Sequence, residues 1–311
     1  MSLSLTIRQL QIFQKVAEKL SFTKAAKSLH LSQPAVSMQV KQLEDICGLP
    51  LFETIGKSVS LTEAGTEVLR IGRQVLANLA EMEEILAALS GVETGTLNLA
   101  VPETAHQFMT LVLAEFRKAH PNIRFNLLIA NRQGLLDHLQ DNTTDLVVMG
   151  QPPKNAGLKS IGFMDNPLVV IASPNHPLNK KKNIPLSELV KHEFVVREAG
   201  SGTRLAMQRF FNENKVSLIS TTEVTNNEAI KHSVAAGLGL GIVSLHTLQQ
   251  QLALKQVSIL DVVEFPINRT WFAVHHQNKL LGPATQAFLE FTINNTRKIW
   301  IKGFPGISRR I

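Results

Sequence analysis

The sequence predicts an α/β protein with an N-terminal winged helix-turn-helix, a long linker helix and a C-terminal region of two α/β subdomains. Three observations predict it. Short, well-capped helical patterns followed by two apolar pieces occupy residues 1–62, an apolar repeat runs through 63–92, and strand and helix patterns alternate over 93–300. Residues 301–311 form a tail without an interpretable pattern. At 311 residues the chain is long enough for two or three folding units.

Composition and charge narrow the class of protein. Hydrophobic residues make up 44% and charged residues 18%, which is typical of a globular protein and excludes a mostly disordered chain. No apolar run reaches the roughly 18 residues that a membrane-spanning helix needs. The N-terminus also lacks the apolar core of a signal peptide, so we expect no association with a membrane and a cytoplasmic location. The single Cys47 allows neither a disulfide framework nor a zinc knuckle, and we expect no metal and no cofactor. A net charge of +7 favours a polyanionic partner.

The first helix is predicted after Thr6, whose hydroxyl can cap it. Its apolar positions recur at three- and four-residue spacing, as on the core-facing side of a helix. These positions are Leu10, Phe13, Ala17 and Leu20.

Two further caps predict a helix-turn-helix. Ser21 can cap a short helix over 22–29, and Ser32 can cap the next, with Pro34 in its first turn, where a missing N–H leaves no bond unmade. Only His30-Leu31 separates the two helices, which is the spacing of a helix-turn-helix.

The third helix has two distinct faces. At 100° per residue, Val36, Val40 and Leu43 fall within about 60° of one another and must face the core. The opposite face carries Pro34, Ser37, Met38 and Lys41, without a large apolar stripe. That face is either an ordinary solvated surface or a surface that enters the major groove of DNA, which admits one helix.

A small hairpin is predicted after the third helix. The apolar pieces Leu51-Phe52 and Val59–Leu61 flank Ile55-Gly56-Lys57, which gives the hairpin a cationic tip. Such a wing beside a helix-turn-helix can reach a neighbouring phosphate or the minor groove.

The residues of this region resemble a known family. The run SFTKAAKSLHLSQPAVSMQVKQLEDICGLPLFETIGKSVSLTEAG, residues 21–65, is similar to the DNA-binding domain of LysR-type transcriptional regulators. The resemblance implies sequence-specific binding to double-stranded DNA. Met38 departs from the pattern, because the family often carries arginine there. The candidate DNA-binding residues are Ser21, Thr23, Ser32, Gln33, Pro34, Ser37, Met38, Lys41 and Lys57.

A long helix follows, capped by Thr62 and running to about Ser90. Its apolar residues recur at alternating three- and four-residue steps, which is typical of a coiled-coil seam. They are Val68, Ile71, Val75, Leu79, Met82, Leu86 and Leu89. A helix of about 28 residues spans about 42 Å and cannot hide this seam in one small domain, so we expect a homodimer or a dimer of dimers on an inverted-repeat operator. The alternative is packing against the rest of its own chain.

The C-terminal region alternates strands and helices, which predicts parallel sheets covered on both faces and two subdomains with a cleft. Strands are expected at 97–101, 123–129, 145–149, 168–172, 194–196, 222–224, 240–243, 257–259 and 270–275. Helices are expected at 105–119, 203–214, 227–236 and 283–297. The region resembles the periplasmic-binding-protein-like effector domain of LysR-type regulators, and the resemblance extends to about residue 297.

Polar residues at strand ends are the candidates for effector binding, because open α/β sheets bind ligands beyond the carboxyl ends of their strands. The six candidates are Thr104, Asn131, Gln151, Ser201, Thr203 and Asn226. Glycines beside Ser201, together with a helix start, favour an anionic group there. The alternative is that Ser201 or Thr203, and likewise Asn226, simply caps a helix.

Three further motifs are similar to the CbbR-type branch of the family, which activates Calvin-cycle genes including those of RuBisCO. They are the runs 197–204, 227–231 and 235–241. The resemblance implies a metabolite-responsive activator of carbon-fixation genes, whose small anionic effector is NADPH or a phosphorylated intermediate, with RNA polymerase as a possible partner. Two alternatives are a LysR-type regulator of another metabolic operon and a solute-binding protein without a regulatory role.

Enzyme motifs are missing from the sequence. It contains no G-x-S-x-G, H-E-x-x-H or G-x-x-x-x-G-K-[ST] pattern, so we expect no catalytic residues and no enzyme. The string Gly237-x-Gly239-x-Gly241 follows a helix and precedes a strand, the reverse of a dinucleotide fingerprint, and is predicted to be a tight turn.

Overall fold

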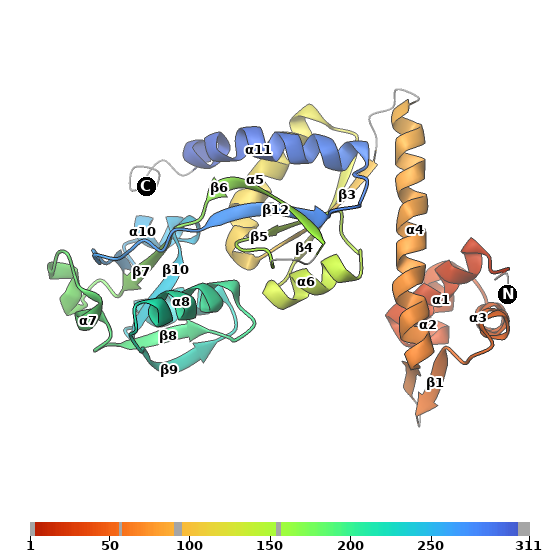
Figure 1. Cartoon of the computed structure of the whole chain (residues 1–311), viewed down its shortest axis with the longest axis horizontal. Coiled ribbons are helices and arrows are strands. Elements are labelled where there is room, and N and C mark those ends of the chain that lie inside the picture. Colours follow the sequence, from red (N-terminus) through yellow and green to blue (C-terminus); the bar gives the residue numbers. More distant parts are fainter. Residues whose placement is uncertain (1–3, 56–57, 90–94, 154–156, 304–311) are drawn as a thin grey trace. The chain divides into compact units, whose positions relative to one another are not determined.

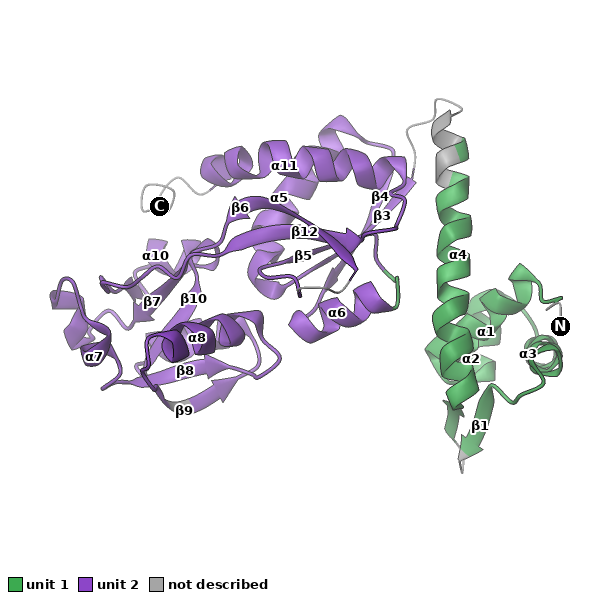
Figure 2. Cartoon of the chain, in the orientation of Figure 1, with its two compact units in different colours: residues 1–90, 141–143 green, residues 91–140, 144–311 purple. Residues whose placement is uncertain are grey.

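The computed structural model describes residues 4–55, 58–89, 95–153 and 157–303. The chain divides into two compact units, residues 1–90 with 141–143 and residues 91–140 with 144–311 (Figure 2). The predicted fold class is confirmed: a winged helix-turn-helix and a long helix in the first unit, and two α/β subdomains in the second. Within the described residues, no helix is long and apolar enough to cross a membrane.

The first unit has the predicted elements (Figure 1). In chain order they are α1 Ile7–Lys19, α2 Phe22–Leu29, α3 Gln33–Cys47, β1 Phe52–Ile55, β2 Ser58–Leu61 and α4 Glu63–Leu89. Thr6, Ser21 and Ser32 accept main-chain N–H groups at the starts of α1, α2 and α3, and Thr62 does so at the start of α4. Strands β1 and β2 pair antiparallel as the wing.

The core of this unit forms where the helices cross. Val36, Val40 and Leu43 of α3 are buried, as their periodicity predicts. The prediction is wrong for Leu20, which is 52% exposed. Leu20 is the C-cap of α1 and has a left-handed backbone with φ 45°, so it lies beyond the last residue of the helical face.

The second unit contains two five-stranded sheets, in the orders β4-β3-β5-β12-β6 and β11-β7-β10-β8-β9. The first sheet consists of β3 Gly95–Val101, β4 Ile123–Ile129, β5 Leu146–Met149, β6 Leu158–Asp165 and β12 Thr270–His276. The second consists of β7 Leu168–Ala172, β8 Glu193–Arg197, β9 Ile219–Val224, β10 Leu240–Ser244 and β11 Ser258–Ile259.

Helices pack on these sheets and connect their strands (Figure 1). The α-helices are α5 Glu103–Ala119, α6 Arg132–Gln140, α7 Leu186–Leu189, α8 Gly202–Glu213, α9 Asn227–Ala235, α10 Gln249–Ala253 and α11 Pro283–Gly303. Short 3-10 turns lie at Pro177–Lys180 and Leu245–Thr247. Helix α11 continues beyond the predicted end at residue 297 and buries Trp300.

The prediction of parallel sheets is wrong in part, because both sheets are mixed. Strand β12 pairs antiparallel with β5 and β6, and β7 pairs antiparallel with β10 and β11. The chain crosses from one sheet to the other after β6 and returns before β12, so these strands run against their neighbours. Periodicity within a segment carries no information about such crossings.

The glycine turn between α9 and β10 is confirmed. Gly237 and Gly239 have φ of 85° and 151°, which side chains disfavour. A Cβ on Gly239 would lie 2.7 Å from the main-chain oxygen of Glu193, so the turn packs directly against strand β8.

Candidate functional site

The outward face of α3 is the first candidate site. Gln33, Pro34, Met38 and Lys41 are exposed, with Met38 at 56%, and Ser37 is partly buried. The amide of Gln33 donates to the hydroxyl of Ser37 at 2.7 Å, so the two side chains are held next to each other. The face therefore offers polar groups and a cation at the start of a helix that is anchored on its other side.

The other candidates lie at the ends of neighbouring elements. The hydroxyls of Ser21 and Ser32 accept helix N–H groups, and Thr23 is exposed in the first turn of α2. Lys57 lies outside the described residues. The carboxylate of Glu44, at the end of α3, accepts the N–H groups of Leu51 and Phe52 at 2.8 and 3.2 Å and so fixes the start of the wing.

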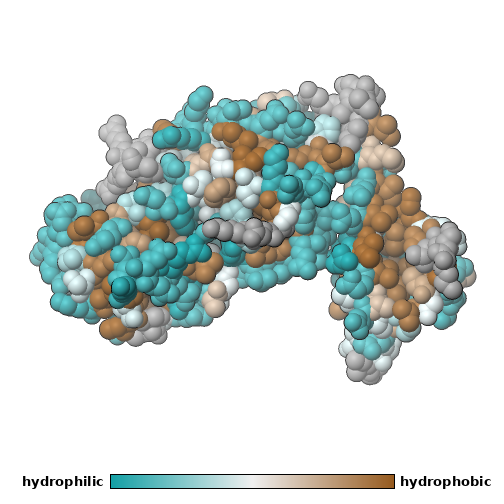
Figure 3. Space-filling model, viewed as in Figure 1, coloured by the Kyte–Doolittle hydropathy of each residue, from teal (hydrophilic) through white to brown (hydrophobic). Residues whose placement is uncertain are grey.

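Helix α4 carries an apolar face that stays partly exposed in the first unit. Figure 3 shows hydrophobic side chains gathered along this helix. Ile71, Val75, Met82 and Leu86 are between 40% and 58% exposed. Val68 and Leu79 of the predicted seam are partly buried, and the side chain of Leu89 lies outside the described residues.

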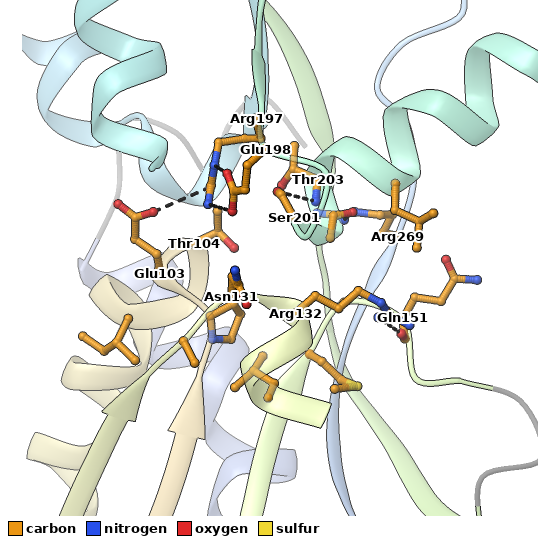
Figure 4. A pocket seen from close by; sticks show the side chains of 18 of the residues that line it. Glu103, Thr104, Asn131, Arg132, Gln151, Arg197, Glu198, Ser201, Thr203 and Arg269 are labelled. Atoms are coloured by element: carbon orange, nitrogen blue, oxygen red, sulfur yellow. Dashed lines mark hydrogen bonds and ion pairs between the residues drawn. The ribbon is translucent and has the colours of Figure 1, made fainter. Parts of the chain in front are cut away.

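A cavity of about 480 Å³ is the main site of the second unit. It lies between residues of the two sheets, and Figure 4 shows its lining. Five predicted residues line it, namely Thr104, Asn131, Gln151, Ser201 and Thr203. Asn226 is not among the lining residues; its side chain accepts the N–H of Ala229 at the start of α9 instead.

Ser201 and Asn131 also act as caps. Ser201 is 3% exposed and accepts the N–H groups of Thr203 and Arg204. The side-chain oxygen of Asn131 accepts the N–H of Gly134. Their acceptor oxygens therefore face helix starts, which leaves the Ser201 hydroxyl hydrogen and the Asn131 amide hydrogens as the groups that can donate to a ligand.

An acidic cluster closes one end of the cavity. Arg197, 6% exposed, donates through two nitrogens to Glu198 at 2.8 and 3.0 Å and lies 3.6 Å from Glu103. Glu103 also accepts the N–H of Asn227 at 2.8 Å. Two carboxylates around one guanidinium leave this end with a net charge of −1, and the cluster joins α5 to β8 (Figure 4).

Two arginines give the opposite end a positive charge. Arg132 donates to the main-chain oxygen of Gln151, and Arg269 donates to that of Gly202 at 3.2 Å. Burial, and then the charge of Arg132, lower the pKa of Arg269 to about 10, so it remains a cation at neutral pH. Burial, and then Arg209, lower the pKa of Arg132.

These two arginines hydrogen-bond to neutral oxygens, and an anion would stabilise both charges. Hydroxyl and amide donors from Thr104, Ser201, Thr203 and Asn131 line the same space, and Ile129, Leu135, Met149 and Trp271 supply apolar walls. The cavity is suited to a small anion with an apolar or hydroxylated body.

The six effector-binding residues predicted from the sequence include neither arginine. Arg132 stands beside the predicted Asn131, and its position directly after a strand end was an available signal. Arg269 lies in a connection between the two sheets, where no local pattern marks it.

Family models match nearly the whole chain. The model of the LysR substrate binding domain matches residues 90–297, and the model of the bacterial regulatory helix-turn-helix protein, lysR family, matches residues 7–66. The chain belongs to the LysR family. Its two units therefore correspond to the DNA-binding and substrate-binding parts of a LysR-type transcriptional regulator.

Relatives of this LysR-family chain include RuBisCO operon transcriptional regulators. The RuBisCO operon transcriptional regulator of Allochromatium vinosum is 47% identical, covering 94% of this chain and 97% of that protein. The HTH-type transcriptional activator CmpR of Synechocystis sp. is 42% identical, covering 92% and 94%.

Solved structures also match this LysR-family chain. The regulatory domain of Synechocystis CcmR in complex with 2-PG is 40% identical, with a TM-score of 0.63, and covers 66% of this chain and 98% of that one. Full-length CbnR in complex with its target DNA is 21% identical, with a TM-score of 0.67 over 95% and 100% of the two chains, which supports the fold.

Proposed function

We propose that this LysR-type regulator binds an inverted-repeat operator of carbon-fixation genes, and that an anionic metabolite in the cavity changes its DNA binding. The observation that carries the operon assignment is the 47% identity to a RuBisCO operon regulator over almost the full length of both chains. The α3 face would contact base edges in the major groove, and the wing would contact the backbone.

Arg132 and Arg269, which form no ion pair with another described residue, support an anionic effector. The CcmR regulatory domain, 40% identical, is known in complex with 2-PG. NADPH and phosphorylated intermediates remain the two classes to be compared. A ligand changes regulation only if it binds two conformations unequally, and the cavity between the two sheets is suited to this because closure would bring its walls together.

The exposed apolar residues of α4 support pairing of two chains as a dimer, or of four as a dimer of dimers. Each helix-turn-helix would then contact one half-site, so two-fold symmetry in the protein matches an inverted repeat in the DNA.

The test is DNase footprinting on the RuBisCO operon promoter of the source genome and on an unrelated promoter, with and without NADPH, 2-phosphoglycolate and ribulose 1,5-bisphosphate. We expect protection of an inverted repeat in the first promoter and a changed footprint with at least one metabolite. Equal protection of both promoters contradicts the operon assignment. An unchanged footprint with every metabolite contradicts the effector assignment.

Lys41 gives a test of the DNA-binding face. Its ion pair with Asp45, at 3.4 Å, joins two side chains that are 70% and 64% exposed, so it is weak and leaves the ammonium free to bind phosphate. We expect Lys41→Ala to weaken binding to all sequences and to make the slope of log K against log salt shallower by about one. Fluorescence anisotropy over a salt series measures this slope, and an unchanged slope removes Lys41 from the phosphate contacts.

Ser37→Ala is the matched contrast, because Ser37 carries no charge. We expect it to leave the salt slope unchanged and to alter the preference between operator variants by roughly 1–3 kcal/mol. Equal losses on all variants would assign Ser37 to backbone contact instead.

A further inference from the structure

A second hollow of about 460 Å³ adjoins the cavity. Gly150, Gln151 and Arg269 line both spaces, so the two spaces meet at these residues. The second hollow adds Arg209 and Phe210 of α8.

Gly150 lines both spaces and is packed closely against Asn166 and Arg269. A Cβ at this position would lie 3.3 Å from the Nδ2 of Asn166 and 3.4 Å from a terminal nitrogen of Arg269. Arg269 lines both spaces, and its buried Nε lacks a hydrogen-bond partner among the described residues. A buried donor without an acceptor is costly, so Arg269 favours an oxygen atom placed beside it.

Gln151 connects the arginines on its two sides. Arg132 donates to its main-chain oxygen, and Arg209 donates to its side-chain oxygen at 2.7 Å. Arg209 therefore adds a third positive charge, in the second hollow, to those of Arg132 and Arg269 in the cavity. Burial lowers the pKa of both Arg132 and Arg269, and charge repulsion adds to it: Arg209 lowers the pKa of Arg132, and Arg132 lowers that of Arg269.

The acidic cluster makes the two ends of the site opposite in charge. An anion bound by Arg132 and Arg269 has Glu103 and Glu198 toward one end of the cavity and Arg209 toward the second hollow. A second anionic group on the same ligand is repelled by the two carboxylates and attracted by Arg209.

We propose that the cavity and the second hollow form one site with two anion subsites, which takes a ligand carrying two anionic groups. Arg132 and Arg269 bind the first group, and Arg209 binds the second after releasing Gln151. This inference rests on the proposed function, because it specifies the class of effector for the same cavity.

The test compares two ligands that differ by one phosphate, ribulose 5-phosphate and ribulose 1,5-bisphosphate, by isothermal titration calorimetry on the full chain. We expect the wild type to bind the bisphosphate at least about tenfold more tightly, the effect of one charge-assisted contact. Arg209→Gln should remove most of this preference and leave the monophosphate affinity unchanged.

Arg117→Gln is the matched control, since Arg117 is an exposed helical arginine that lines neither space. It should keep the wild-type preference. If the wild type binds both sugars equally, or if Arg209→Gln keeps the full preference, the second subsite is overturned while the effector role of the cavity stands. If neither sugar binds, the second subsite is overturned as well, and the footprint on the RuBisCO operon promoter then decides the proposed function separately.

Discussion

The double substitution Val75→Asp and Met82→Asp is expected to convert the protein to monomers. Both residues lie on the apolar face of α4, where Val75 is 40% and Met82 is 51% exposed. In a paired helix interface, each chain would place two carboxylates in apolar contact, and an ionised group there loses hydration without gaining a partner. We expect the dissociation constant of the dimer to rise at least ~100-fold, or roughly 3 kcal/mol. Sedimentation velocity measures this change.

Operator affinity should fall with the dimer. A monomer binds one half-site and loses the gain from simultaneous engagement of two, which is commonly about 10²–10⁴-fold. The matched control is Thr66→Asp with Ala80→Asp. It adds the same charge at exposed positions of α4, and at 100° per residue Ala80 lies about 180° around the helix from Ile71. An intact oligomer in the Val75 and Met82 variant would contradict pairing through this face.

Arg132→Gln is expected to weaken binding of phosphorylated effectors by about 10–100-fold, since a charge-assisted hydrogen bond contributes about 1.5–3 kcal/mol. Calorimetry with 2-phosphoglycolate and NADPH measures the loss. Arg132→Lys keeps the charge and should restore part of the affinity, because a lysine cannot form the forked contact of a guanidinium.

The control for this prediction is Arg124→Gln, at an exposed position of β4 outside the cavity. It removes the same charge from the same unit and should change the affinity by less than about twofold. If both variants lose affinity equally, the effect comes from the overall field of the protein and Arg132 does not contact the ligand.

Much of the fold could be predicted because its signals are local. The caps at Thr6, Ser21 and Ser32 and the periodicity of α3 depend on residues within one or two turns of each other. Strand β6 gave no such signal, since its sequence LKSIGFMD interleaves a glycine and charged residues with its apolar ones. Helix α6 and the last turns of α11 were missed because the helical repeat of apolar residues is weak in each. Their apolar residues pack against other helices and strands, which the local sequence does not show.

The two candidate sites also differ in how far local sequence predicts them. The α3 face could be predicted from one helix, because the buried positions determine which residues face outward. For the cavity, only the positions of polar residues at strand ends could be predicted. Asn226 was predicted to contact the effector but caps α9, and the local sequence does not distinguish these two roles.

The sequence by itself determined the two-part architecture, the helix caps and the outward face of α3, because hydrophobic period and capping act over a few residues. Only the tertiary structure decided the direction of the mixed sheets and the charge of the cavity. Arg269 lies far along the chain from Arg132. The two arginines line one cavity because the chain crosses between the sheets twice, after β6 and before β12. The two crossing segments lie side by side, and the N–H of Asn166 in the first donates to the main-chain oxygen of Arg269 in the second. That meeting depends on the path of the whole chain, which no local pattern encodes.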